Sequence, residues 1–465
     1  MEGPSAASGE AASRRLAGHV AGTGYAALPP EAVHGFKRAC LDYFAVAVSG
    51  AAMPVSRAVL DYFRDNDGRS DACVVGTEAR LSCPNAAMVN GANAHGLDFD
   101  DGYTQGSTHP AGATFPAVFA TAERYGCAPQ RVVAAMVLAY DVTLRIAAAM
   151  HPVSARKGLH NTPNAGVFGA AAGVSSVLGS DAATTAHALG LAGSFASGIR
   201  EYLSEGAEVK RIHPGKAARD GLICAELARR GVTGPSKILE GRFGFFNLVA
   251  DGRPDWGKLF DGLGREFRIS DAYFKPYPCC RHFHALVDAV RILQARRPFG
   301  PDAVRRLELG LYEVGVMGHD HKHAANLLDA QMSAPVVAAL AIARGDLTAL
   351  SFAPDMLADP VVSRLVDRTD VRVDAECEQA YPARRSGRVR IELTDGTRLE
   401  ERVIDPRGEG SNPMSDGDLE RKFLVNCEPV IGRGKCNRLI DAVWQFERLP
   451  DLGAFFDWSD GRTGA

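Results

Sequence analysis

Several motifs that mark common enzyme classes are missing from this 465-residue sequence. It contains no GxGxxG, no P-loop, no GxSxG and no HExxH pattern, so hydride transfer, phosphoryl transfer and serine hydrolysis lose their usual sequence support. The ten cysteines include no CxxC pair and are scattered, apart from the neighbours Cys279 and Cys280. This usage is typical of a reducing compartment rather than a disulfide scaffold, and we expect a cytoplasmic protein.

A strong net charge is also absent, because 52 basic and 55 acidic side chains leave a formal net charge of −3. No global field then favours nucleic acid or an anionic membrane. Continuous apolar stretches such as 132–140 are too short to span a bilayer. Residues 1–15 lack the apolar core of a signal peptide and are predicted to be disordered. We expect neither a nucleic-acid nor a membrane partner, and an anionic ligand would need a local basic cluster.

Length and periodicity predict two domains, since a chain of this length exceeds what one compact core normally holds. From about residue 28 to 250 the apolar spacing is helical, and several segments begin at Pro or Asp. The predicted helices cover 29–50, 110–125, 129–150, 163–178 and 181–202. Their many Ala and Gly residues indicate closely packed helices in an all-α core.

Alternation of apolar and polar residues appears after about residue 270. It predicts strands at 307–311 and 371–373, and a hairpin of 388–393 with 398–404 around an Asp-Gly turn. Predicted helices lie at 283–295, 330–343 and 354–367. The range 271–410 is therefore expected to be a small α+β domain, after which residues 415–446 return to helix.

Two segments place carboxylates and histidines next to predicted helix starts. In the first, His95-Gly-Leu-Asp-Phe-Asp-Asp101 precedes His109. A helix start suits anions, and a carboxylate beside a His can orient its ring and set its pKa. Capping of the helix by these acids is the alternative. In the second segment, 158–162, His160 could donate to a substrate carboxylate or could be a surface residue.

A third segment, Glu208 to Lys216, holds four potential cations within seven residues and is predicted to lie in front of a helix. These cations are Lys210, Arg211, His213 and Lys216. In a slightly acidic chain they form a local basic cluster. The pattern fits an anion site and equally fits a solvated run of charges.

The fourth segment runs from Lys275 through Pro-Tyr-Pro-Cys-Cys to Arg281 and on to His284. Arg281 could clamp a carboxylate with two parallel hydrogen bonds. A thiol at a helix start beside cations is expected to have a lowered pKa and could shuttle protons. A metal held by Cys279, Cys280, His282 and His284 is also conceivable, but the spacing fits no structural zinc pattern, and no metal is predicted.

The fifth segment, Gly318-His-Asp-His-Lys-His323, could be a metal or anion loop or a solvated loop. Whether His319, His321 and His323 reach a pocket is left open.

Seven segments, in order along the chain, resemble those of the MmgE/PrpD family, which includes 2-methylcitrate dehydratase, cis-aconitate decarboxylase and iminodisuccinate epimerase. They are HGLDFDD with THPAG, GLHNT, SGIREYLSEGAEVKRIHPGKAA, GPSKILEGRFGFF, KPYPCCRHFHALVDA, DAQMSAPVVAAL and NPMSDGDLERKF. They are spread between residues 95 and 423, and the resemblance extends over about residues 15–446.

The resemblance implies a mainly α fold: a large all-helical domain, here 16–270 with 411–465, and a smaller α+β lid domain, here 271–410. It also implies a homodimer that uses neither a metal nor an organic cofactor, with the active site between the two domains. The family pocket, carried over residue by residue, comprises Asp98, His109, His160, Lys210 and Lys275.

Three positions depart from the decarboxylase pattern. Gly102 stands where that pattern has Thr, Cys280 where it has His, and Val336 where it has Tyr. Dehydratase members carry a carboxylate near the position of Cys280. The resemblance therefore identifies the family and leaves the reaction open.

The sequence thus predicts a cofactor-free lyase, a dehydratase or decarboxylase, that acts on a small di- or tricarboxylic acid through a carbanion next to a carboxylate. The predicted catalytic residues are His109, Cys280, Asp98 and Lys210. The predicted substrate-binding residues are His160, Lys275, Arg281, His213 and His284. An epimerase that removes and returns an α-proton is the alternative reaction, and a non-catalytic family member is the alternative class.

Overall fold

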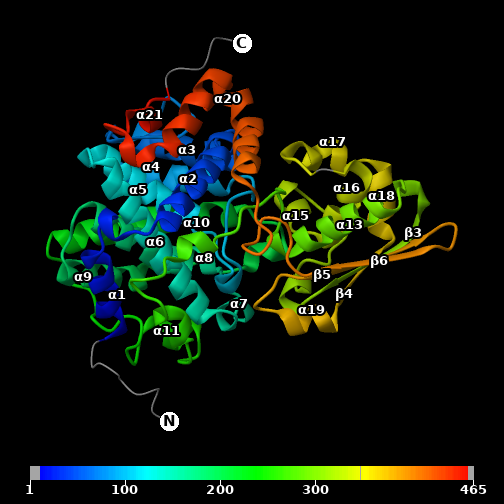
Figure 1. Cartoon of the computed structure of the whole chain (residues 1–465), viewed down its shortest axis with the longest axis horizontal. Helices are drawn as coiled ribbons and strands as arrows, with labels where there is room; N and C mark the ends of the chain where they lie inside the picture. Colours follow the sequence, from blue (N-terminus) through cyan, green and yellow to red (C-terminus); the bar gives the residue numbers. More distant parts are fainter. Residues whose placement is uncertain (1–10, 346, 459–465) are drawn as a thin grey trace.

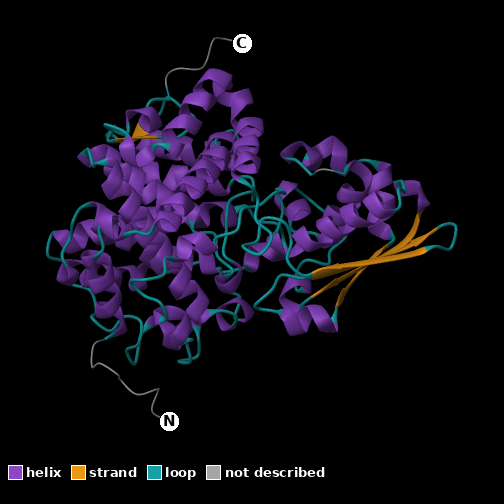
Figure 2. Ribbon diagram, viewed as in Figure 1, coloured by secondary structure: helices purple, strands orange, loops and turns teal. Residues whose placement is uncertain are grey.

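The computed structural model describes residues 11–345 and 347–458 of the chain, and these are mainly helical, as predicted. A large helical part is joined to a smaller part that holds a four-stranded mixed sheet (Figure 2). The predicted disorder of residues 1–15 is wrong for Ala12 onward, where the first helix begins, while residues 1–10 lie outside the described range.

The helical part is built mostly from the N-terminal half of the chain (Figure 1). Its helices are α1 Ala12–Gly22, α2 Pro30–Gly50, α3 Pro54–Asn66, α4 Cys83–His95, α5 Ala111–Tyr125, α6 Pro129–Met150, α7 Val153–Arg156, α8 Asn161–Val177, α9 Ala182–Phe195, α10 Val209–Arg229, α11 Phe245–Val249 and α12 Trp256–Phe260. A short ribbon, β1 Ala72–Cys73 with β2 Arg80–Leu81, lies at its edge.

Glycine allows the central helices to approach closely, as the sequence predicts. A Cβ on Gly169 of α8 would lie 2.5 Å from the Ala139 carbonyl oxygen of α6, and one on Gly215 of α10 would lie 2.1 Å from the Met88 carbonyl oxygen of α4. Both distances are shorter than van der Waals contact, so larger residues would push these helix pairs apart.

The predicted helix 181–202 is too long. Helix α9 ends at Phe195, and a loop with Gly198 at φ +134° leads to the 3₁₀ helix η3 Glu201–Ser204. This backbone conformation favours glycine and ends the helical run. The loop carries Arg200 to the junction with the second part of the molecule.

The second part contains the strands β3 Val304–Leu311, β4 Thr369–Val373, β5 Gly387–Leu393 and β6 Arg398–Val403, in the order β4-β3-β5-β6. Strand β3 is parallel to β4 and antiparallel to β5, and β5 and β6 form the predicted hairpin. Leu307 is paired with Ile391, and Leu309 with Val389; all four are buried. Their side chains share a core with the helices that cover the sheet.

The helices of this part are α13 His284–Arg296, α14 Glu313–Val316, α15 Leu327–Gln331, α16 Ala334–Arg344, α17 Pro354–Leu357, α18 Pro360–Asp367 and α19 Ala375–Ala380. Two predicted helices are interrupted. Ser333 caps a new helix by accepting from Val336 N, which divides 330–343 into α15 and α16. Asp359 caps Val361 N at 2.8 Å before Pro360, which divides 354–367 into α17 and α18.

The chain then returns to the helical part with α20 Asp416–Trp444 and α21 Gly453–Phe456. Helix α20 packs on α2, far away in sequence (Figure 1). Its Lys422 donates to Asp42 at 2.6 Å and to the Phe99 carbonyl oxygen at 2.7 Å. The last helices thus support a loop from the first quarter of the chain.

Helix α6 is longer than the apolar stretch recognised in the sequence, and its length and composition alone would allow it to cross a membrane. Its most apolar 18-residue window is completely buried inside the molecule, which is how a core helix behaves. Helices α2 and α3 meet the same criteria only if they are joined across a bend of 82°.

Candidate functional site

A cavity of about 60 Å³ lies where the helical part meets the second part. Residues from all five segments singled out in the sequence line it, although they are far apart in the sequence, and seven of them are predicted site residues. They are Asp98, His109, His160, Lys210, Lys275, Cys280 and Arg281. Two predicted binding residues, His213 and His284, do not line the cavity and lie behind residues that do.

The buried loop 96–102 forms the floor of the site, and its backbone carbonyl groups are bound by side chains from distant segments. Gln331 donates to Leu97 O at 2.8 Å, Lys275 to Asp98 O at 2.8 Å, and Lys422 to Phe99 O at 2.7 Å. Arg211 donates to Gly96 O. A buried carbonyl without a partner is costly, so these bonds fix the position of the loop.

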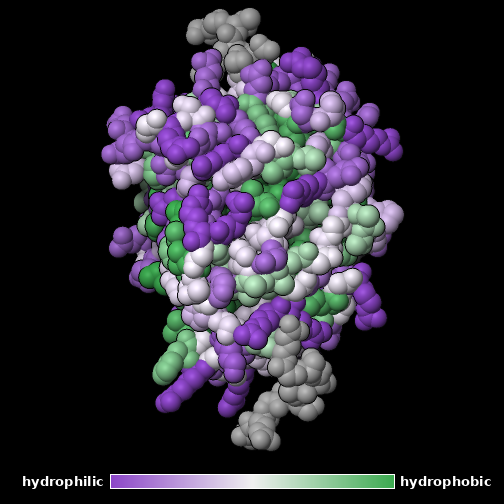
Figure 3. Space-filling view, turned by 90° about the vertical axis from the view of Figure 1, so that its left-hand side faces the viewer, coloured by the Kyte–Doolittle hydropathy of each residue, from purple (hydrophilic) through white to green (hydrophobic). Residues whose placement is uncertain are grey.

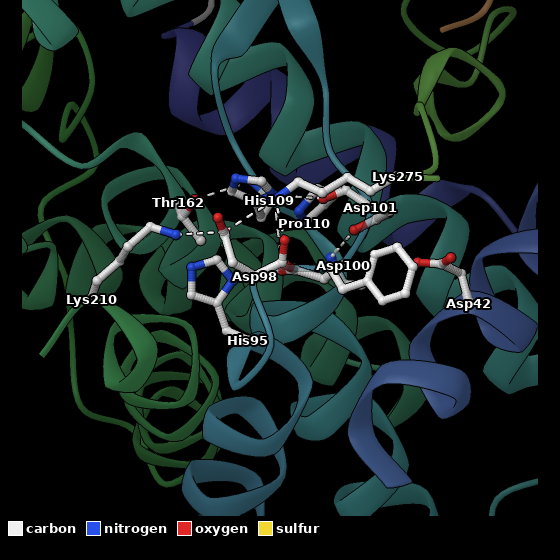
Figure 4. Close-up of polar contacts among 12 residues, drawn as sticks. Asp42, His95, Asp98, Asp100, Asp101, His109, Pro110, Thr162, Lys210 and Lys275 are labelled. Atoms are coloured by element: carbon white, nitrogen blue, oxygen red, sulfur yellow. Dashed lines mark hydrogen bonds and ion pairs between the residues drawn. The ribbon is translucent and has the colours of Figure 1, made fainter. Parts of the chain in front are cut away.

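Asp98 is the centre of the charged network (Figure 4). Its Oδ1 accepts from Lys210 Nζ at 2.5 Å and from Lys275 Nζ at 3.1 Å, whereas its buried Oδ2 has no partner among the described residues. Burial alone would raise the pKa of the Asp98 carboxyl, but the two lysines outweigh it and hold that pKa well below its usual value. Burial lowers the pKa of Lys275, but Asp98 and Asp100 raise it by more, so Lys275 stays charged.

His109 is held as a neutral ring with a defined tautomer. Its Nδ1 lies 2.6 Å from the Asp101 carbonyl oxygen, which can only accept, so the ring hydrogen is on Nδ1 and Nε2 keeps a lone pair. Burial is the main cause that lowers the pKa of His109 to about 3, and Lys275 adds to it against Asp100. The lone pair on His109 Nε2 can therefore accept a proton as a general base.

The other two acids of the first segment, Asp100 and Asp101, do not line the cavity and bind groups behind its wall (Figure 4). Asp100 accepts from His95 at 2.8 Å, and Asp101 accepts from Tyr140 Oη at 2.8 Å and from Ala111 N at 3.2 Å. The capping interpretation is thus right for Asp101, which binds the start of α5. It does not apply to Asp98, which faces the cavity.

The third segment was predicted to lie in front of a helix. It lies instead within α10, because that helix begins at Val209. Its cations therefore point in different directions. Lys210 lines the cavity, Arg211 lies behind it, and Lys216 pairs with Asp220 at 2.5 Å. His213 Nδ1 lies 2.9 Å from His160 Nδ1, so His213 supports the cavity-lining His160.

In the fourth segment, the Cys280 pKa and the partner of Arg281 differ from what the sequence predicts. The pKa of the Cys280 thiol is raised rather than lowered, first by burial and next by the negative charge of Asp98. Arg281 is already paired with Glu409 at 3.0 Å and stacks on the Tyr273 ring. Its Nη1 donates to His284 Nδ1 at 3.0 Å, so His284 positions the guanidinium from outside the cavity.

The three residues that depart from the decarboxylase pattern, Gly102, Cys280 and Val336, differ in their position relative to the cavity. A Cβ on Gly102 would be 2.3 Å from the Tyr273 hydroxyl oxygen, so the tyrosine occupies the space that a threonine side chain would need. Tyr273 and Cys280 line the cavity. Val336 is in α16, inside the core of the second part, and does not line the cavity.

Sequence reasoning did not assign part of the cavity wall, chiefly Arg200, Tyr202, Tyr273, His282 and Arg385, and it left His319 open. His282 and His319 belong to segments that were singled out, but Arg200 fell inside a predicted helix and Arg385 in a loop without a recognisable motif. Of the fifth segment, His319 lines the cavity, whereas His321 pairs with Asp329 at 2.9 Å and His323 is exposed.

Among the described residues, two clusters of three side chains have the spacing of metal ligands: Cys280, His282 and His319, and also His95, Asp98 and Asp100. In the first cluster, Arg385 and Tyr312 both place donors on His282 Nδ1, so the ring hydrogen lies on Nε2, where a metal would need a lone pair. In the second cluster, Asp98 is bound by two lysines, whose charge disfavours a metal cation. The donor sets do not fit a metal.

Comparison with known proteins gives two family matches. The MmgE/PrpD N-terminal domain matches residues 14–256, and the MmgE/PrpD C-terminal domain matches residues 277–447. The cis-aconitate decarboxylase-like protein oryM of Aspergillus oryzae is 27% identical, with 91% of this chain and 92% of that protein covered. The cis-aconitate decarboxylases of Mus musculus and Homo sapiens are each 26% identical, with 89% of this chain and 86% and 87% of theirs covered.

Proposed function

Because the chain belongs to the MmgE/PrpD family, we propose that it is a lyase that acts on a small di- or tricarboxylic acid through a carbanion next to a carboxylate. Distant relatives are named cis-aconitate decarboxylases, which is consistent with such a substrate. The observation that carries the proposal is the pair of lysines that share one aspartate, Asp98, beside the neutral His109.

The lysine pair supplies the electrostatic part of the chemistry. Two ammonium groups share one carboxylate oxygen of Asp98, and both can also bind a substrate carboxylate in the cavity that they line. When an α-carbon loses a proton or CO2, the electron pair that stays behind spreads onto the adjacent carboxylate. The lysines hold that carboxylate more strongly as charge develops, which lowers the barrier.

His109 and Cys280 supply the proton transfers in this scheme. In a dehydration, His109 Nε2 takes the α-proton, the carbon–oxygen bond breaks, and the leaving hydroxide takes a proton from an acid. In a decarboxylation, the carbon–carbon bond breaks, CO2 leaves, and the carbanion takes a proton. The raised pKa of Cys280 keeps its thiol protonated, so it is the candidate acid in both cases.

Three measurements on the purified protein separate the reactions. A decarboxylase releases CO2, a dehydratase increases ultraviolet absorbance by forming an alkene, and an epimerase exchanges the α-hydrogen with solvent deuterium while substrate mass is otherwise conserved. The proposal fails if citrate-like acids give none of the first two signals, or if Lys210→Ala and Lys275→Ala leave the activity intact.

Epimerisation is a second candidate because two proton carriers of different chemistry, His109 and Cys280, line the same cavity. One could remove the α-proton and the other return one. Deuterium exchange without CO2 or alkene would favour this reaction. A non-catalytic role would be supported if citrate-like acids raised the melting temperature but no assay showed turnover.

We also propose a cytoplasmic homodimer. The unpaired state of all ten cysteines agrees with a reducing compartment. The homodimer rests on the family resemblance, and the helical face shown in Figure 3, which carries hydrophobic side chains among the hydrophilic ones, is one surface at which a second copy could bind. Light scattering coupled to size-exclusion chromatography tests the dimer, and a monomer across the micromolar range would contradict it.

A further inference from the structure

The cavity has two kinds of basic residue. Lys210, Lys275 and Arg281 each have a carboxylate within 4.0 Å, whereas Arg200 and Arg385 have none among the described residues. We propose that Arg385 and Arg200 form a second carboxylate subsite, which binds a third carboxylate of the substrate and makes the site selective for tricarboxylates over dicarboxylates. This inference rests on the proposed function, since both concern the same cavity.

Arg385 is the main group of this subsite. It lies in the loop between α19 and β5, is 3% exposed and lines the cavity. Its guanidinium donates to the Thr104 carbonyl oxygen at 2.9 Å and to the Tyr312 hydroxyl at 3.2 Å, and it lies over the Tyr312 and Tyr381 rings. Its Nε has no acceptor among the described residues. A buried cation balanced only by neutral groups is costly unless an anion completes the site.

Arg200 approaches the same region from the other part of the molecule. It is half-buried in the loop between α9 and η3, and it lines the cavity together with Tyr202. Arg200 lines the same cavity as His282 and His319, and its positive charge lowers the pKa of both; Arg385 is bonded to the first of these histidines. An anion between the two arginines would therefore contact both parts of the chain.

His282 adds a neutral donor to this subsite. Its Nδ1 lies 3.3 Å from Arg385 Nη1 and is also bonded to the Tyr312 hydroxyl, so it accepts and the ring hydrogen remains on Nε2. Burial, followed by Arg385, keeps the pKa of His282 well below its usual value and the ring neutral. Two guanidinium groups and one N–H donor suit a carboxylate, whereas they repel a metal cation.

The Asp98 end of the cavity is organised differently. There the lysines already hold a carboxylate of the protein, and Arg281 holds Glu409. The unbalanced charge is greatest at the arginines, so a substrate with a reacting carboxylate at the lysines gains most by placing a further carboxylate there.

The test uses two unreactive probes that differ by one carboxylate, tricarballylate and 2-methylsuccinate. Isothermal titration calorimetry on the full chain measures both dissociation constants. We expect tricarballylate to bind more tightly, and Arg385→Gln to weaken it by about 30-fold or more, the loss typical of a buried charge pair, while 2-methylsuccinate is little affected. The adjacent Arg384, which is exposed and pairs with Asp405, gives the matched control Arg384→Gln, which should change neither constant.

Arg200→Gln is a second test variant, at a half-buried position, in case Arg385→Gln does not fold. It should weaken tricarballylate in the same direction by a smaller factor. The subsite is overturned if either folded variant keeps the wild-type preference between the two probes. If the preference disappears as expected but no acid is turned over, the subsite stands and the proposed lyase function fails. If acids are turned over while the preference is unchanged, the lyase function stands and the subsite fails.

Discussion

The two walls of the cavity differ in how their charges are balanced. The wall around Asp98 and His109 comes from the helical part, and its charged groups and those behind it, such as His95 and Asp100, lie in contact with each other. The wall around Arg385 and His282 comes from the second part, and no carboxylate lies within 4.0 Å of that arginine in the described residues. The first wall is suited to moving protons, because its groups already have defined partners. The second is suited to holding an anion, because its charge lacks one.

The largest expected effect is on the proton-transfer wall. His109→Asn should lower kcat by about 10²- to 10⁴-fold, since it removes the lone pair proposed to take the substrate proton. His34→Asn is the control, because His34 is exposed and bonded to Asp416 far from the cavity. Steady-state kinetics with the substrate identified by the assays above would measure both. A His109 variant with wild-type kcat would remove the histidine from the mechanism.

The next effect is on stability, because the same wall depends on α20. Lys422→Met should leave Asp42 buried without its cation and remove the bond to Phe99 O. We expect the free energy of unfolding to fall by about 3–5 kcal/mol, as when one partner of a buried ion pair is lost. Urea denaturation measures it.

The neighbouring Arg421 controls for the change of charge on α20. Its side chain is 71% exposed, and Arg421→Gln should stay within about 0.5 kcal/mol of the wild type. Equal losses in the two variants would show that helix α20, rather than the buried pair, accounts for the change.

Lys210→Gln should cost about 10²- to 10³-fold in kcat, by analogy with the loss of a donor to a developing negative charge. Its KM should change less than its kcat, because the charge on the substrate carboxylate grows in the transition state. Lys216→Gln on the same helix is the matched control, since Lys216 pairs with Asp220 outside the cavity. A purely structural role for Lys210 would instead lower the melting temperature and leave kcat of the folded fraction unchanged.

The smallest effect concerns pH. Burial is the main cause that lowers the pKa of His109 to about 3 and of His319 to about 3. Unfolded histidine has a pKa of about 6.5. Between these values the unfolded chain binds more protons, so the free energy of unfolding should decrease as the pH falls from 6.5 towards 3.

Replacing His319 with Asn should make that decrease shallower by about 1 kcal/mol per pH unit or less, measured by urea denaturation at several pH values. Because the pKa of His109 is lowered to about 3, protonation of its ring should cause no fall in kcat as the pH decreases through 6.5. A fall in kcat near pH 6.5 that is absent in His109→Asn would contradict this, because it would mean that the ring is protonated near its usual pKa in the folded protein.

Local patterns predicted much of the fold. The helices α2 and α6 and the hairpin β5–β6 occur at their predicted residues because apolar periodicity and turn chemistry are local properties. The prediction of one helix over 181–202 was wrong, because apolar periodicity does not show the backbone turn at Gly198. The predicted lowering of the Cys280 pKa was also wrong, because burial and Asp98 outweigh the neighbouring cations.

By itself, the sequence determined most of the helical and strand segments, the family resemblance and the cavity-lining residues within recognisable motifs, such as Asp98, His109 and Lys275. The tertiary structure decided which charges meet. Lys210 and Asp98 are 112 residues apart, and no local rule pairs them. It also placed Arg200 and Arg385 on the cavity wall and moved His213 and His284 behind it. The balance of charge at a buried site depends on such long-range contacts, because desolvation makes each missing partner costly.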